Sequence, residues 1–163
     1  MKEKKTDLLA IAISFVAACF TFFLYLSKYL SKNEQILNRI YERSGQLNIV
    51  AGRSGYFLYI LYFVGLIFFL MLGFFIYKII FKLVKVNINN AKLLLTVETA
   101  YAVTFLIGYI AIGFIPFVAI IILCNLIEMS MVVYMCMDEV RPQLFKVILC
   151  RSILIVLSLF VCF

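Results

Sequence analysis

Residues 93–137 read LLLTVETAYAVTFLIGYIAIGFIPFVAIIILCNLIEMSMVVYMCM, and the length of this run is the first clue to the fold. Nearly all of it is apolar, yet a single helix of that length would reach roughly 67 Å, about twice the hydrocarbon thickness of a bilayer. The run must therefore fold back on itself, and GFIP at 113–116 supplies a turn because glycine and proline interrupt helices. We expect one membrane span near 93–112 and a second near 115–137.

The rest of the chain has the same character. Its 163 residues are 66% hydrophobic and only 14% charged, whereas soluble domains are about half apolar and about a quarter charged. A globule of this size cannot hide such an excess from water. The composition therefore predicts an all-α, polytopic helical membrane bundle that forms a single integral membrane domain over 1–163. Further apolar runs near 8–27, 56–81 and 144–163 bring the expected number of transmembrane helices to about five.

The cysteines raise the question of lipidation and of metal binding. VAAC at 16–19 fits a bacterial lipoprotein cleavage box, which would leave Cys19 as a lipidated amino terminus. The apolar run continues after Cys19 through FTFFLYL, whereas the hydrophobic part of a signal peptide is short, so we expect an uncleaved span. The chain has no histidine and no CxxC spacing, and we interpret its cysteines as apolar packing residues rather than zinc ligands or disulfide partners. The five positions are Cys19, Cys124, Cys136, Cys150 and Cys162.

Residues 28–55 form the long polar segment between the first two spans. SKNE at 31–34 resembles a capping box with Ser31 as the N-cap, and the apolar residues that follow fall on one helical face. We expect a short amphipathic helix over 32–43. It either lies on the lipid surface or on its own bundle, or it docks a partner, because amphipathicity alone does not separate these roles.

Small residues at helical spacing predict where the spans approach closely. One stripe lies on the first span and another on the third. Their members are Ala10, Ser14, Ala18 and Thr21, then Ala100, Thr104 and Gly108.

The distribution of Lys and Arg predicts the orientation. With the amino terminus in the cytoplasm, nine basic residues lie inside and five lie outside, and the positive-inside rule favours that arrangement. The carboxyl terminus is then outside, and the cell membrane is the expected location. The difference between the two sides is moderate, because the five basic residues of the outer loop at 28–55 are many for an outer loop. The net charge of +7 is explained by these flanks and by anionic lipid headgroups, so we do not expect nucleic acid as a partner.

Glu128 lies in the fourth expected span with no charged residue within nine positions on either side. Arg151 lies at a similar depth in the fifth span, which is joined to the fourth by a short loop. An isolated charge at that depth costs at least about 3 kcal/mol, so a partner is expected. We predict an ion pair between Glu128 and Arg151, with Asn125 on the same face of the helix. The alternatives are a functional polar site, a pair that fixes helix packing, and a neutral Glu128 without a partner.

Three other acidic residues lie near the ends of the expected spans. Glu98 lies near a span end and is expected to reach the membrane interface. Asp138 and Glu139 are expected in a loop beside Arg141.

Catalytic motifs are absent from this sequence: we find no HExxH, GxSxG or glycine-rich phosphate loop, and no base near a cysteine. We therefore predict no catalytic residue, no metal site, no cofactor and no enzyme activity. The preferred hypothesis is a non-catalytic subunit or assembly partner of a membrane complex, in contact with the lipid bilayer and with another membrane protein or further copies of itself. The alternative is a small ion- or solute-translocating protein that uses Asn125, Glu128 and Arg151 as an intramembrane polar site.

Overall fold

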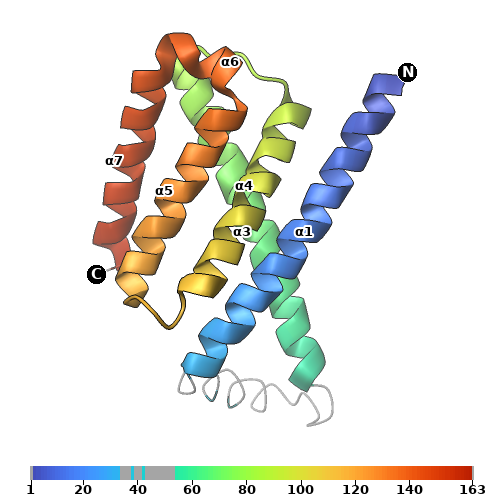
Figure 1. Cartoon of the computed structure of the whole chain (residues 1–163), viewed down its shortest axis with the longest axis vertical. Helices are drawn as coiled ribbons and strands as arrows, with labels where there is room; N and C mark the ends of the chain where they lie inside the picture. The colour runs from blue at the N-terminus through green and yellow to red at the C-terminus, as the bar shows by residue number, and fades with distance from the viewer. Residues whose placement is uncertain (1, 34–37, 39–41, 43–53, 163) are drawn as a thin grey trace.

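The computed structural model describes residues 2–33, 38, 42 and 54–162. Its helices follow one another up and down the long axis of the molecule, so that neighbours along the chain are antiparallel (Figure 1). They are α1 (Lys2–Lys32), α3 (Ser54–Val84), α4 (Asn90–Ala111), α5 (Phe117–Met135), the short α6 (Met137–Val140), a 3-10 turn (Arg141–Gln143) and α7 (Leu144–Cys162).

Within the described residues, four helical segments are long and apolar enough to cross a membrane. They are Leu8–Lys32, Tyr62–Val84, Asn90–Ala111 and Val118–Met135. The prediction of an all-α bundle of the membrane type is therefore confirmed. The helix α7 covers 19 residues where a fifth span is expected, and its crossing of the membrane stays a prediction.

The predicted turn at GFIP is present between α4 and α5. Gly113 has a φ of 115°, which is a conformation that residues with a side chain rarely adopt, and this explains the glycine at that position. Pro116 directly precedes the first residue of α5. The predicted N-cap at Ser31 is wrong. Ser31 lies inside α1, and its hydroxyl donates to the carbonyl of Lys28 at 2.9 Å. The remainder of the expected amphipathic helix at 32–43 falls outside the described residues, apart from single positions.

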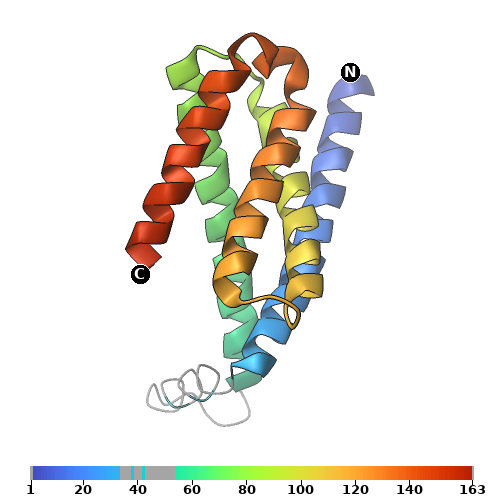
Figure 2. The same ribbon diagram turned by 60° about the vertical axis from the view of Figure 1, so that its left-hand side comes forward.

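The helix α4 is the centre of the bundle. Half of its span is buried, against 22% to 28% for the other three spans. It packs against α1, α3 and α5, while α7 contacts α3 and α5 (Figures 1 and 2).

The interface between α1 and α4 contains the predicted small residues of α1. Ala18 has no exposed surface and packs with Ala102 and Phe105 of α4, and Ser14 and Thr21 are also buried, so the two helices approach closely there. The predicted stripe of α4 faces elsewhere: Ala100 packs with Tyr77 and Val132, and the carbonyl of Thr104 accepts from Cys124 of α5.

The carboxyl-terminal end of α4 is covered by a cation from α1. Lys28 Nζ donates to the carbonyl oxygen of Tyr109 at 2.8 Å and lies 4.5 Å from the centroid of the Tyr109 ring. The last carbonyls of a helix have no partner within the helix and carry partial negative charge, so a lysine is favourable there. This contact holds the carboxyl-terminal part of α1 against the carboxyl-terminal end of α4.

The end of α3 is a Schellman motif. Val86 N donates to the carbonyl of Phe81 at 2.8 Å, Lys85 N donates to that of Lys82 at 3.2 Å, and Lys85 has the left-handed φ of 61° that the motif requires. Glycine is the usual residue at such a position, and a lysine costs conformational energy there. The motif therefore holds the backbone of Lys85 in one conformation at the end of the helix.

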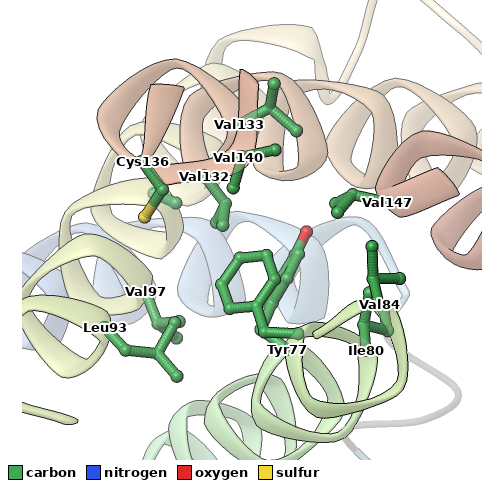
Figure 3. Packing of buried hydrophobic residues seen from close by; sticks show 12 residues of the cluster. Tyr77, Ile80, Val84, Leu93, Val97, Val132, Val133, Cys136, Val140 and Val147 are labelled. Carbon is green, nitrogen blue, oxygen red and sulfur yellow. The ribbon is translucent and has the colours of Figure 1, made fainter. Parts of the chain in front are cut away.

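Two groups of buried residues hold the helices together. One joins α1, α3 and α4 around Phe22 and Phe105, whose ring centroids are 4.9 Å apart. The other joins α3, α4, α5, α6 and α7, and Figure 3 shows Tyr77 near its middle, with the hydroxyl directed toward the side that holds Val147. A tyrosine hydroxyl in such a place needs a polar partner, because burial without a hydrogen bond is costly.

Candidate functional site

The link between α5 and α7 brings these two helices side by side. The helix α5 ends at Met135, and α6 and the 3-10 turn occupy only Met137–Gln143 before α7 begins. Cys136 and Val140 in this link are fully buried and anchor it to the core. Residues on facing sides of α5 and α7 can therefore meet at equal depth, as the sequence predicted for Glu128 and Arg151.

The predicted ion pair is present in the structure. Arg151 Nη2 lies 2.5 Å from Glu128 Oε2, and the two side chains are only 8% and 3% exposed. A charge-assisted hydrogen bond of this kind is the strong form of the interaction. It also solves the problem that an isolated charge would pose among apolar helices.

Two further residues complete the surroundings of the guanidinium group. Asn125 Oδ1 accepts from Arg151 Nη2 at 3.3 Å, while Asn125 Nδ2 donates to the carbonyl of Ile121 at 2.9 Å, which orients the amide. On the opposite side, Arg151 Nε donates to the hydroxyl of Tyr77 at 3.3 Å, and the guanidinium carbon lies 5.5 Å from the centre of the tyrosine ring. The candidate site thus consists of Tyr77 from α3, Asn125 and Glu128 from α5, and Arg151 from α7.

The buried Glu128 Oε1 forms no close hydrogen bond among the described residues. The hydroxyls of Tyr77 and Tyr101 nevertheless interact with the Glu128 carboxyl. Three grooves in the described part of the bundle have linings that include none of the four site residues. The described residues also contain no cluster of three or more acidic or cysteine side chains suited to a metal ion. The arrangement is that of an internal cross-link between α3, α5 and α7, with Tyr101 of α4 also interacting with the Glu128 carboxyl.

Glu98 does not reach the interface, and that expectation is wrong. Its side chain is buried, with 3% of its surface exposed, and its Oε2 accepts from Ser14 Oγ at 2.5 Å. Glu98 is on the face of α4 that packs against α1. Its position around the helix therefore decides its environment, rather than its distance from the end of the span. The contact adds a polar link to the small-residue interface between α1 and α4.

Glu139 lies in α6, in the link beside Arg141, and has a partner that the sequence did not predict. Its Oε1 lies 2.5 Å from Lys92 Nζ, at the start of α4, and the side chains of Glu139 and Lys92 are 29% and 39% exposed. The hydrogen bond from Lys92 holds the pKa of the Glu139 carboxyl below its ordinary value. The pair ties the link between α5 and α7 to the central helix.

Replacing Glu139 by glutamine should lower the stability by at most about 1 kcal/mol at neutral pH, because the pair is partly open to solvent. A carboxyl group whose pKa is lower in the folded protein stabilises it above the pKa of the unfolded state, and this contribution is lost as the pH falls through the folded value. The melting temperatures of the wild type and Glu139→Gln should therefore differ at pH 7 and converge near pH 3. Asp138→Asn, at an exposed neighbouring carboxylate, is the control; an equal effect there would contradict a specific pair.

Sequence reasoning identified Asn125, Glu128 and Arg151 but missed Tyr77 and the contact of Ser14 with Glu98. Tyr77 is one of ten tyrosines in the chain and lies in an almost wholly apolar run. Apolar residues surround it on every face of α3, so the sequence carries no signal that distinguishes its inner face. By contrast, the small-residue stripe that includes Ser14 indicated a buried hydroxyl that needs an acceptor.

Comparisons with protein-family models, with curated protein sequences and with solved structures find no match to this chain.

Proposed function

We propose that this chain is a non-catalytic subunit or assembly partner of a membrane complex. The observation that supports the proposal is that the buried Arg151 forms hydrogen bonds with Glu128, Asn125 and Tyr77 of its own chain. These bonds join α3, α5 and α7, which is a structural role. The large apolar side chains exposed on α1 and α3 then remain for contact with lipid and with the helices of a partner.

The experiment is purification of the full chain in a mild detergent, followed by native gel electrophoresis and mass measurement. A subunit should migrate with a second membrane protein, or with further copies of itself, in a fixed ratio. The double variant Glu128→Gln/Arg151→Gln should keep that association if it remains folded. A chain that migrates alone as a monomer under every mild condition would contradict the proposal.

A second candidate is translocation of an ion or small solute, and the buried Glu128 Oε1, which forms no close hydrogen bond among the described residues, favours it. A buried acceptor of this kind can take up a proton or contact a cation. This candidate requires a flux of protons or cations into liposomes that contain the purified chain. It also requires that Glu128→Gln abolishes the flux while the protein stays folded.

The proposed orientation has the amino terminus in the cytoplasm and the carboxyl terminus outside the cell membrane. The amino-terminal end of α1, the loop after α3 and the link before α7 lie at one end of the bundle (Figure 2). That end carries Lys82, Lys85, Arg141 and Lys146, and the positive-inside rule supports a cytoplasmic position for it.

A further inference from the structure

A basic groove lies at the end of α3. Its volume is about 620 Å³, and its polar lining comes from lysine and asparagine side chains, with no carboxylate among the lining residues. The three lysines are exposed, and none of them takes part in the two ion pairs that described residues form. They are Lys78, Lys82 and Lys85, and the asparagines are Asn87, Asn89 and Asn90. Such a set of donors suits a negatively charged group.

A second groove of about 480 Å³ lies between α1, α3 and α4, and its lining is almost wholly apolar. Asn90 lines both grooves, so the two are adjacent. The carboxylate of Glu98, which also borders the apolar groove, is engaged by Ser14. In Figure 1 the amino-terminal part of α1 diverges from α3.

One face of α3 runs through both grooves. Its residues follow one another at spacings of three or four, which places them in a row along the helix. Lys78 Nζ lies 5.5 Å from the centre of the Phe74 ring, so the basic part begins where the apolar part ends. The row consists of Met71, Phe74, Lys78, Lys82 and Lys85, with Phe75 beside it.

We propose that the two grooves together form a binding site for one anionic phospholipid. The phosphate group of the lipid lies among the lysines and asparagines, and one acyl chain lies in the apolar groove. The positive end of the α4 dipole is at the same place, because α4 begins at Asn90, and it adds to the attraction for the phosphate. Basic pockets between membrane helices are suited to anionic lipid headgroups. A free anion would use only the basic half.

The first test measures lipid binding to the purified full chain by native mass spectrometry, with phosphatidylglycerol and phosphatidylcholine that carry the same acyl chains. The variant Lys82→Gln/Lys85→Gln should bind phosphatidylglycerol about 25-fold more weakly, at about fivefold for each lysine, with binding of phosphatidylcholine unchanged. The control Lys32→Gln/Lys146→Gln removes the same charge from exposed positions outside the basic groove and should change binding less than about twofold. Equal losses in the two double variants would overturn the proposal in favour of diffuse attraction.

The second test addresses the acyl chain. Ala91 lines the apolar groove, so Ala91→Phe fills it without changing the charge. This variant should lose at least about tenfold in affinity for phosphatidylglycerol, while Ala17→Phe, at an exposed position of α1, should bind as the wild type does. Melting curves verify that each variant is folded. Unchanged binding by folded Ala91→Phe, or displacement of the lipid by millimolar inorganic phosphate, would show an anion site without lipid specificity and would overturn the proposal.

Discussion

Glutamine at position 128 or at position 151 alone should destabilise the protein by about 2–3 kcal/mol, somewhat less than the roughly 3–5 kcal/mol found when a buried pair is broken in a soluble interior. Snorkelling and water defects reduce the loss in a bilayer. Each single variant leaves one charge without its partner at a place where the side chains are almost fully buried. Unfolding in detergent or lipid, followed by helical signal, gives the free energies.

The double variant Glu128→Gln/Arg151→Gln should lose less than the sum of the two single losses. Neither charge is then stranded, and the shortfall, expected at about 0.5–3 kcal/mol, is the coupling between the residues. Lys146→Gln removes a cation from an exposed position on the same helix and should cost little. Strict additivity would mean that the pair contributes no mutual stabilisation.

The two single variants should also respond differently to pH. In Arg151→Gln, the remaining Glu128 carboxylate can take up a proton, so the loss of stability should shrink in acid. In Glu128→Gln, the remaining guanidinium cannot lose its proton, and the loss should persist between pH 5 and pH 8.

A leucine at position 18 should destabilise the protein by about 1–3 kcal/mol, because Ala18 has no exposed surface and lies where α1 meets α4. The larger side chain must separate the two backbones, and this also lengthens the contact between Ser14 and Glu98, one turn away. Thermal unfolding in detergent measures the effect.

Ala17→Leu makes the same change one residue earlier, on the exposed face of the same helix, and should be neutral. The difference between the two variants therefore isolates the packing of α1 on α4 from any change in helix propensity or in hydrophobicity. Equal stabilities would contradict a close α1 and α4 interface.

The sequence predicts the helices and the central ion pair better than the remaining contacts, and the reason is physical. Span length and polarity are properties of single segments, so the runs at 93–112 and 115–137 and the turn between them can be read directly. Glu128 and Arg151 could be paired because a short link makes their helices neighbours and fixes their relative depth. No such constraint relates α3 to α7, so the contribution of Tyr77 depended on packing that the sequence does not specify.

The errors have the same origin. Glu98 was assigned by its distance from a span end, although its direction around the helix placed it against Ser14. Ser31 matched a capping pattern, but the continuing helix used its hydroxyl internally. The pairing of Glu139 with Lys92 was not predicted, because it depends on α4 bringing Lys92 to the link.

The pairing of α1 with α4 has a consequence for biosynthesis. A chain made from its amino terminus delivers α1 to the bilayer before α4 has left the ribosome. During that interval α1 can satisfy its own hydroxyls, since Ser14 Oγ donates to the carbonyl of Ile11 at 2.9 Å and Thr21 Oγ1 to that of Ala17 at 3.0 Å. When α4 arrives, the Glu98 carboxyl competes with the carbonyl of Ile11 for the single hydroxyl proton of Ser14. The hydroxyls of α1 can therefore be hydrogen-bonded within α1 while the helix is alone in lipid, and the Glu98 carboxylate then provides a polar contact with α4.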